Sequence, residues 1–528
     1  MRTTRAFVLA LALLSPSTPA RAEDTTVKSR ITGVDLFKNG LVIVKREVTL
    51  GKPGTYVLDD VPSPVHGTFW IETPGPIEAS VKTRDVAVPV GEAGPVDLQQ
   101  DLAGKSVTLY FKAANRAPVV GTMLKVKPPK DENTSLSPYL LVETTRGRAY
   151  VNRSEVSYVE AEGVGDTVMR RRPSLILTWG GTDRAENRVV IRYLTHGMAW
   201  APSYRVDTTD PKTLLLEQHA TLRNELCDLE GAEVRLISGY PSVEYAHVRS
   251  LLGPRTNLEM FLAEVGSRGL FPSFPMNISP LSNGPLTQQV GGNYRNSPIE
   301  IALGAVPTGE GVDLHFQSIG KRTLSKGEVL ALTVAKGKAD YERVVEWLVP
   351  DSRNEYGQLS EHGRDDADDA WDALKFKNPL PYPMTTGPAT VSSAGDFNGQ
   401  RTSFWVNAGE ETVLRVGKAL SVRTRAAEYE LSKPDAEREL VWIGGRQYRK
   451  ATVEGELAVG NYRKDTVTLY IRKRFTGELV KAEGNPRVTL RQAGAYLVNK
   501  QNELVWSLTL KGGEDKKLKY SYSVLVQN

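Results

Sequence analysis

Residues 189–204 read VVIRYLTHGMAWAPSY, and this stretch decides the fold class of the chain. Its first half alternates apolar and polar side chains, which is the period of a half-buried strand. Pro202 forces Ala201 out of helical geometry, and the rings of Trp200 and Tyr204 are expected to anchor a sheet face. The same alternation recurs along most of the chain, so the sequence predicts a mainly β, multi-domain protein with few short helices.

Changes in composition divide the chain into units. Closely spaced strand signals predict a small SH3-like β-barrel, because closure removes exposed strand edges. Evenly spaced strands near the C-terminus predict an immunoglobulin-like β-sandwich. The expected units are an N-terminal β domain over 23–97, the barrel over 98–161, a main β domain over 175–440 with a mobile insertion at 253–311, and the sandwich over 441–528.

The first 22 residues have the features of an export signal. A basic start precedes the apolar run Ala6–Leu14, which is too short to span a bilayer, and Ala20-Arg21-Ala22 fits a signal-peptidase site. An N-terminal anchor is the rival interpretation, but prolines end the apolar run early. No later run reaches membrane-spanning length. We therefore expect an exported protein, periplasmic or secreted, that starts at Glu23 and has no transmembrane segment.

Composition argues against nucleic-acid binding. Lys and Arg number 67 against 62 Asp and Glu, which gives a net charge of +5. Three of these basic residues, Arg2, Arg5 and Arg21, lie in the predicted signal, so the mature chain is close to neutral and lacks the basic face that nucleic acids require. Cys227 is the single cysteine, so the chain cannot form an internal disulfide.

Local motifs give little support to an enzyme. None of the six histidines has His-Glu-x-x-His or His-x-His spacing, and no nucleophile elbow, Walker loop or dinucleotide fingerprint occurs. No metal or cofactor is predicted. A Cys227 nucleophile with His196 or His219 as its base would be spatial rather than sequential, so it stays open. The neighbouring acids would raise the thiol pKa, which favours a structural cysteine.

The acidic run Asp365–Asp372 resembles a calcium loop at first sight. It lacks the glycine and the glutamate that such a loop needs at positions six and twelve. A helix explains the run better, with Ala370, Trp371 and Leu374 on one face, acids in the first turn, and Pro379 as the stop.

A spaced set of residues also carries a family resemblance. Its members are Tyr193, Gly197, Trp200, Pro202, Tyr204, Gln218, Ala220, Asn224, Leu236, Ser238, Gly239, Pro241, Asn378, Pro379, Pro381 and Pro383. The set resembles the β-rich domain of the mucoidy-inhibitor-A-like proteins, a bacterial family mainly of domains of unknown function. The resemblance covers roughly residues 30–90 and 175–528. It implies structural roles for these residues, a place in the cell envelope, and no known catalytic residues.

These observations together predict a non-catalytic structural or interaction scaffold of the envelope. The expected partner is an envelope polysaccharide or another envelope protein. A glycan- or peptide-binding module, using the small barrel and exposed aromatic residues, is the first alternative. A hydrolase with a nonlocal His/carboxylate site is the second.

Overall fold

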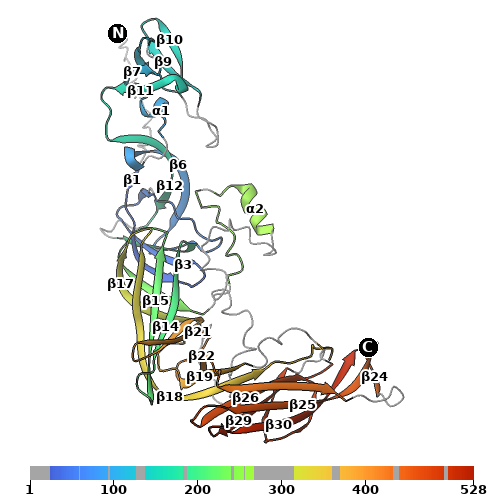
Figure 1. Ribbon diagram of the computed structural model, residues 1–528. Coiled ribbons are helices and arrows are strands. Elements are labelled where there is room, and N and C mark those ends of the chain that lie inside the picture. The colour runs from blue at the N-terminus through green and yellow to red at the C-terminus, as the bar shows by residue number, and fades with distance from the viewer. Residues whose placement is uncertain are drawn as a thin grey trace, which may run out of the picture. The chain divides into compact units, whose positions relative to one another are not determined.

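The computed structural model describes residues 24–58, 60–92, 96–113, 115–126, 137–181, 187–239, 243–254, 256–266, 314–359, 369–431, 439–492 and 498–527. The predicted signal peptide and most of the predicted insertion lie outside the described residues. Within them the chain is mainly β, with several sheets and two α-helices, so the predicted fold class is confirmed (Figure 1). No helix among the described residues is long and apolar enough to cross a membrane.

The chain forms two compact units. The first comprises residues 1–32, 44–195 and 244–273, and the second comprises 33–43, 196–243 and 274–528. Strands β2 (Arg30–Leu36) and β3 (Leu41–Leu50) contribute residues to both. The first unit holds β1 (Thr25–Thr26), β4 (Gly54–Leu58), β5 (Trp70–Glu72), β6 (Ile77–Pro89), α1 (Leu98–Asp101), β7 (Ser106–Phe111), β8 (Val119–Met123), β9 (Tyr139–Thr144), β10 (Gly147–Asn152), β11 (Val156–Ala161), β12 (Thr167–Trp179), β13 (Asn187–His196) and α2 (Leu258–Gly266).

The second unit contains the remaining strands. They are β14 (Met198–Asp207), β15 (Thr213–Asn224), β16 (Leu229–Ser238), β17 (His315–Leu324), β18 (Val329–Val349), β19 (Ala370–Lys377), β20 (Gly387–Ser393), β21 (Asp396–Ser403), β22 (Glu411–Lys418), β23 (Val422–Glu430), β24 (Leu440–Ile443), β25 (Arg446–Asn461), β26 (Val467–Thr476), β27 (Glu478–Ala482), β28 (Arg487–Gln492), β29 (Gln501–Leu510) and β30 (Asp515–Gln527).

The small unit predicted at 98–161 is a five-stranded antiparallel sheet. Its strand order is β10-β9-β8-β7-β11, around a core that includes Leu109, Met123, Leu140 and Val142. Strands β7 and β9 show the alternation that the sequence predicts, with buried side chains at every second position of their first four residues. The pairings among the described strands do not close the sheet, so the predicted barrel closure is not found.

Strand β18 organises the second unit. Its first half pairs with β15, and its second half pairs with both β19 and β26. One core lies between β14, β15 and β20 on one side and β19 and β22 on the other. A second core surrounds Val345 and Trp347 of β18, with β25, β26, β29 and β30. Because β26 pairs with β18, strands after residue 440 share a sheet with strands of the predicted main domain.

The helix predicted over the acidic run is wrong in its described part. Trp371 and Leu374 lie in strand β19, which is sandwiched between β18 and β22 in antiparallel pairing. Residues 360–368 lie outside the described residues. Pairing with two neighbouring strands outweighs the local preference of this segment for a helix, which is weak compared with tertiary contacts.

The quoted stretch forms β13 and β14, and its aromatic residues are buried. Trp200 is 1% exposed, and its Nε1 donates to the carbonyl of Ile237 at 3.2 Å. The hydroxyl of Tyr204 accepts the amide of Thr385 at 2.6 Å, and burial raises the pKa of this phenol. The carbonyl of Pro202 lies so close to β20 that a Cβ at Gly387 would approach it to 2.8 Å.

Three asparagines in the second unit link the end of one strand to a turn that lies beside it. At the end of β25, the side-chain Nδ2 of Asn461 donates to the carbonyls of Asp465, Leu510 and Lys511 at 2.9–3.1 Å. Its Oδ1 accepts the amide of Arg463 at 3.0 Å. Asn461 is 1% exposed, so its side-chain amide forms hydrogen bonds with four backbone groups in the protein interior.

Further hydrogen bonds hold the turn that Asn461 contacts. The amide of Gly513 donates to the Asn461 carbonyl at 2.7 Å, and the Asn461 amide donates to the Glu514 carbonyl at 2.9 Å. The Glu514 carboxylate then accepts the amide of Lys511 at 2.8 Å. Gly513 has φ +77°, a conformation that favours glycine.

The same arrangement occurs twice more. Asn224 makes these contacts with the turn between β17 and β18, and Asn378 makes them with the turn that precedes β22. In every case the asparagine ends a strand that pairs with the strand following the turn. The three turns are Ser325-Lys326-Gly327-Glu328, Asn407-Ala408-Gly409-Glu410 and Lys511-Gly512-Gly513-Glu514. We call each arrangement an asparagine clasp.

The remaining motif residues lie around these clasps. Pro379 follows Asn378. A Cβ at Gly337 would lie only 2.6 Å from the Pro379 carbonyl, so the backbone of β18 packs directly against the backbone of this loop. Pro383 is buried and Pro381 is exposed. Gly239 has φ +114° directly after β16. The chain has no cis peptide bond among the described residues, so these prolines are trans.

Candidate functional site

A cleft in the second unit combines charged, aromatic and hydroxyl groups. It has a volume of about 270 Å³ and lies among strands β18, β19, β21 and β22. Its lining residues are Glu346, Leu348, Trp371, Phe376, Met384, Arg401, Thr402, Ser403, Phe404, Thr412, Val413, Leu414 and Arg415. We call it the Trp371 cleft.

Trp371 and Arg401 form the polar end of this cleft. The guanidinium carbon of Arg401 lies 3.9 Å from the centroid of the Trp371 ring, within the range of a cation–π contact. Trp371 is 8% exposed, whereas Arg401 is exposed. Within the described part of the chain, no acidic side chain forms an ion pair with Arg401. The stacking therefore holds this guanidinium in place while its N–H groups stay available.

Two further cations near Trp371 are already neutralised. Arg415 and Lys418 both lie 5.7 Å from the ring centroid. The Nε of Arg415 donates to Glu346 at 2.7 Å, and Lys418 donates to Asp369 at 2.5 Å. Of these three cations, Arg401 is the one that forms no ion pair with an acidic side chain of the described residues.

The ion pairs continue from the cleft across the sheet. Glu346 also lies 3.7 Å from Arg472 of β26, which donates to Glu503 of β29 at 2.7 Å. Glu503 in turn accepts from Arg474 at 3.2 Å. Arg472 and Glu503 are less than a tenth exposed, so this chain of pairs fixes Glu346 and, through it, Arg415.

Part of the cleft lining is apolar. Phe376, Met384 and Leu414 are almost fully buried, and they belong to the core beneath. Phe404 is 38% exposed. The hydroxyls of Thr402, Ser403 and Thr412 complete the lining. The arrangement can hold an anionic group at Arg401 while an amphipathic body rests on the apolar wall.

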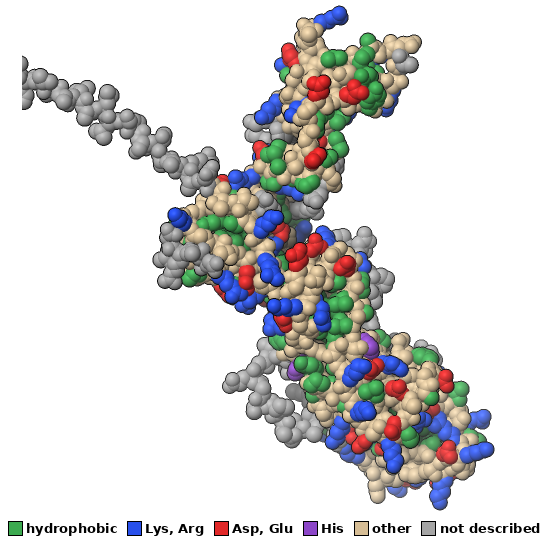
Figure 2. Space-filling view, turned by 90° about the vertical axis from the view of Figure 1, so that its left-hand side faces the viewer, with side chains coloured by type: hydrophobic (Ala, Val, Ile, Leu, Met, Phe, Trp, Pro, Cys, Tyr) green, Lys and Arg blue, Asp and Glu red, His purple; other side chains and the backbone are tan. Residues whose placement is uncertain are grey.

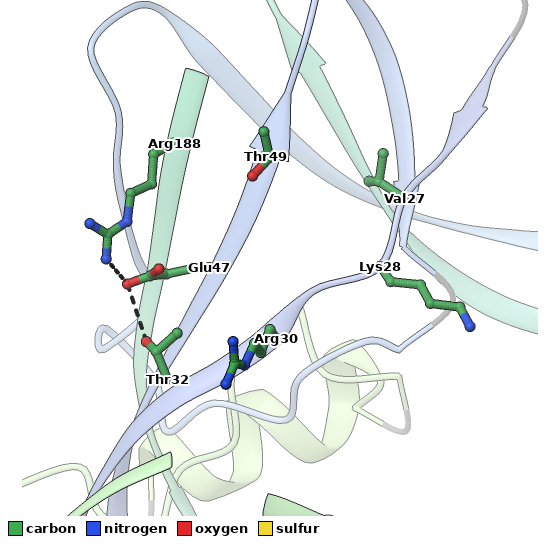
Figure 3. A pocket seen from close by; sticks show the side chains of 7 residues that line it. All are labelled: Val27, Lys28, Arg30, Thr32, Glu47, Thr49 and Arg188. Atoms are coloured by element: carbon green, nitrogen blue, oxygen red, sulfur yellow. Dashed lines mark hydrogen bonds and ion pairs between the residues drawn. The ribbon is translucent and has the colours of Figure 1, made fainter. Parts of the chain in front are cut away.

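A second hollow lies in the first unit, with a volume of about 470 Å³. It is lined by Val27, Lys28, Arg30, Thr32, Glu47, Thr49 and Arg188 (Figure 3). Arg188 forms an ion pair with Glu47, and this hydrogen bond lowers the Glu47 pKa, while Thr32 donates to the same carboxylate at 3.3 Å. Lys28 points away from Glu47 (Figure 3). The Glu47 carboxylate is thus already paired with Arg188, and the lining of this hollow contains no aromatic side chain.

The small five-stranded sheet exposes several tyrosines, as the binding-module alternative requires. Tyr150 and Tyr158 are more than half exposed. Tyr158 stacks on Tyr110 with centroids 4.4 Å apart, and the Tyr110 hydroxyl donates to Glu160 at 3.1 Å. Tyr110 and Tyr158 cover part of each other's ring surface. The Trp371 cleft, by contrast, combines a cation, hydroxyls and apolar side chains in one hollow.

The described histidines contact various groups rather than one centre. His219 lies 3.2 Å from the Thr333 hydroxyl, and His247 lies 3.2 Å from the Glu264 carbonyl. Burial lowers the pKa of His196. Among the described residues, no group of three or more His, Cys, Asp or Glu side chains is arranged to hold a metal ion. His362 lies outside the described residues.

Cys227 belongs to the first asparagine clasp. The Nδ2 of Asn224 donates to the Cys227 carbonyl at 2.7 Å, and the Cys227 amide donates to the Asn224 Oδ1 at 3.4 Å. The thiol is half-buried. The clasp therefore explains the position of the Cys227 backbone.

A buried polar network in the second core was not predicted from the sequence. Lys473 is 2% exposed, and its Nζ donates to Glu428 at 3.0 Å. Tyr520 donates to the same carboxylate at 2.6 Å. Nearby, Thr476 donates to Asp351 at 2.6 Å. The alternation of β26 signals a core position for Lys473, but its charged partners come from distant strands.

Asp351 is expected to make the stability of the second unit depend on pH. Burial raises the pKa of Asp351 to about 6, although Lys473 and the Thr476 hydroxyl act in the opposite direction. The folded state therefore retains this proton up to a higher pH than the unfolded state. Stability contributed by the protonated form is lost as the pH rises from about 4 to about 6, by roughly 3 kcal/mol.

Asp351→Asn should abolish this loss, because its amide carries no charge at any of these pH values and its Oδ1 can still accept the amide of Arg353. Denaturant unfolding at pH 4, 5, 6 and 7 measures the difference between wild type and variant. The exposed Asp396→Asn is the control, and its difference from wild type should stay flat. Parallel pH profiles for wild type and Asp351→Asn would contradict the burial argument.

The sequence did not predict the Trp371 cleft. The residues that matter come from four strands, and placing Trp371 on a helix hid its relation to Arg401. The alternation of Leu374 and Phe376 with Lys375 and Lys377 was the local pattern that could have indicated a strand. In comparisons with known proteins, no family model and no curated protein matches the chain.

Proposed function

We propose that this chain is an exported protein of the bacterial envelope that acts as a non-catalytic interaction scaffold and holds its partner at the Trp371 cleft. The observation that carries the proposal is the exposed Arg401 guanidinium, stacked on Trp371 and without an acidic partner among the described residues. A fixed, uncompensated cation beside an apolar wall is suited to binding an anionic partner and requires no chemical step.

The distribution of charge supports an envelope partner over a nucleic acid. On the face shown in Figure 2, Lys and Arg side chains are interspersed with Asp and Glu, and neither sign forms a large patch. Nucleic-acid binding normally needs a continuous basic face to neutralise successive phosphates. A single excess cation in a cleft is better suited to one anionic group of a polymer or a protein.

The binding proposal is tested by retention of isolated envelope material. Mature protein, residues 23–528, is immobilised and exposed separately to purified envelope polysaccharide and to peptidoglycan. Wild type should retain one of them, and Arg401→Gln should lose most of that retention because the excess charge is gone. Arg423→Gln is the matched control, since Arg423 lies over the exposed Tyr462 ring at 4.9 Å, away from the cleft. Equal retention by wild type and Arg401→Gln would overturn the proposal.

Export is tested separately by the mass of the mature chain. The apolar run and Ala20-Arg21-Ala22 predict cleavage before Glu23. Intact-mass measurement on protein recovered outside the cytoplasm should give a chain that begins at this residue. Recovery of a membrane-bound species that retains residues 1–22 would show an anchor instead.

A further inference from the structure

We infer that the Trp371 cleft recognises the carboxylate of an acidic sugar, so that the partner is a uronate-containing polysaccharide. This inference rests on the proposed function and goes further by assigning the ligand class. It is carried by the geometry of Arg401, by the charge balance around Trp371, and by the composition of the cleft wall.

The geometry of Arg401 favours a planar anion. A guanidinium that lies over an indole ring at 3.9 Å directs its N–H groups outward from its own edge. Two of these groups match the two oxygens of a carboxylate, which gives a bidentate pair stronger than a single hydrogen bond. Stacking on Trp371 limits the freedom of the arginine before the ligand arrives, so less conformational entropy is lost on binding.

The charge balance favours a single negative charge. Arg415 and Lys418 are paired with Glu346 and Asp369, whereas Arg401 has no acidic partner among the described residues. A doubly charged phosphate monoester would be only half neutralised, and it would lie near the buried Glu346. One carboxylate would pair with the one cleft guanidinium that lacks an acidic partner among the described residues.

The wall of the cleft favours a sugar ring over an aliphatic chain. The exposed ring of Phe404 and the half-buried side chains of Leu348 and Val413 can contact the C–H face of a pyranose. Threonine and serine hydroxyls in the same lining can pair with sugar hydroxyls. The volume of about 270 Å³ lies just below the range typical of pockets for drug-sized ligands, so the cleft accommodates one ring of a polymer.

The test compares the binding of four ligands that differ in their anionic group or in what carries it. Titration calorimetry is performed on the mature protein with an oligomer of galacturonic acid, with its fully methyl-esterified counterpart, with a glycerol phosphate polymer, and with N-acetylphenylalanine. Wild type should bind the acidic oligomer best. The methyl ester, which keeps the ring and loses the charge, should bind at least about tenfold more weakly.

The variants locate the interaction. Arg401→Gln should weaken binding of the acidic oligomer by at least about tenfold, and Arg401→Lys should fall between wild type and Gln because it keeps the charge without the fork. Arg423→Gln should bind as wild type. Thermal melts of all variants should coincide with wild type, since Arg401 is exposed.

Each contrary result has a defined meaning. Equal binding of the ester would show recognition of a neutral glycan, tighter binding of the phosphate polymer would show a phosphodiester ligand, and tighter binding of N-acetylphenylalanine would show a peptide terminus. Any of these, or no binding of the acidic oligomer, overturns the inference. If envelope material is still retained in an Arg401-dependent way, the proposed function stands alone. If Arg401→Gln matches wild type in both experiments, the inference and the proposed function are both wrong.

Discussion

Replacing Asn461 with Asp is expected to lower the free energy of unfolding by about 3–5 kcal/mol at neutral pH, although the two side chains have nearly the same shape. The Nδ2 of Asn461 donates to three backbone carbonyls, and a carboxylate oxygen at that position repels all three. The site is 1% exposed, so water does not replace the lost donors.

The effect of Asn461→Asp should shrink in acid. A protonated carboxyl regains one donor and loses its charge, so the variant approaches wild type as the pH falls. Denaturant unfolding of wild type and variant at pH 7 and pH 4 measures this. Asn115→Asp, at an exposed turn position, is the control and should change stability by less than about 0.5 kcal/mol. A variant as stable as wild type at pH 7 would show that the clasp contributes little.

Replacing Trp200 with Ala is expected to destabilise the second unit by about 3–5 kcal/mol, a large share of the stability of a domain. The ring is 1% exposed, and its removal leaves a cavity and deprives the Ile237 carbonyl of its donor. Trp200→Phe should lose less, because it refills part of the space. Thermal melts and yields of exported protein measure both variants.

Cys227→Ser serves as the contrast to Trp200→Ala. Serine is close to cysteine in size, and the backbone of residue 227 keeps its bonds to Asn224, so a change within about 1 kcal/mol is expected. The structural interpretation of both residues would be wrong if Trp200→Ala melts like wild type while Cys227→Ser abolishes a cellular phenotype without unfolding. Cys227 would then be the place to look for a reaction.

The strands could be predicted because alternation is a local property. In β13, Val189, Ile191 and Tyr193 are buried while the residues between them are more exposed, and this period of two is visible without knowing the partner strand. The same reasoning failed at Trp371. Acids before an apolar face have the local features of a helix, and only the pairing of β19 with β18 and β22 makes the segment a strand.

The clasps and the cleft could not be predicted for a different reason. Asn224 was noticed in the sequence, but its partners lie 100 and 101 residues further along the chain. For Asn378 and Asn461 the corresponding separations are 28–29 and 49–50, so no constant period reveals the repetition. The turns themselves, each ending in Gly-Glu, were the one local signal. Likewise, nothing in sequence spacing brings Arg401 over Trp371.

The length of β18 has a consequence for how the second unit unfolds. Ala335 and Tyr341 of this strand pack on one core, and Val345 and Trp347 belong to the other. Withdrawing the strand from either core would drag its remaining half out of register in the neighbouring one. We therefore expect the two cores to unfold together under heat, and force applied through the C-terminal strands to load both.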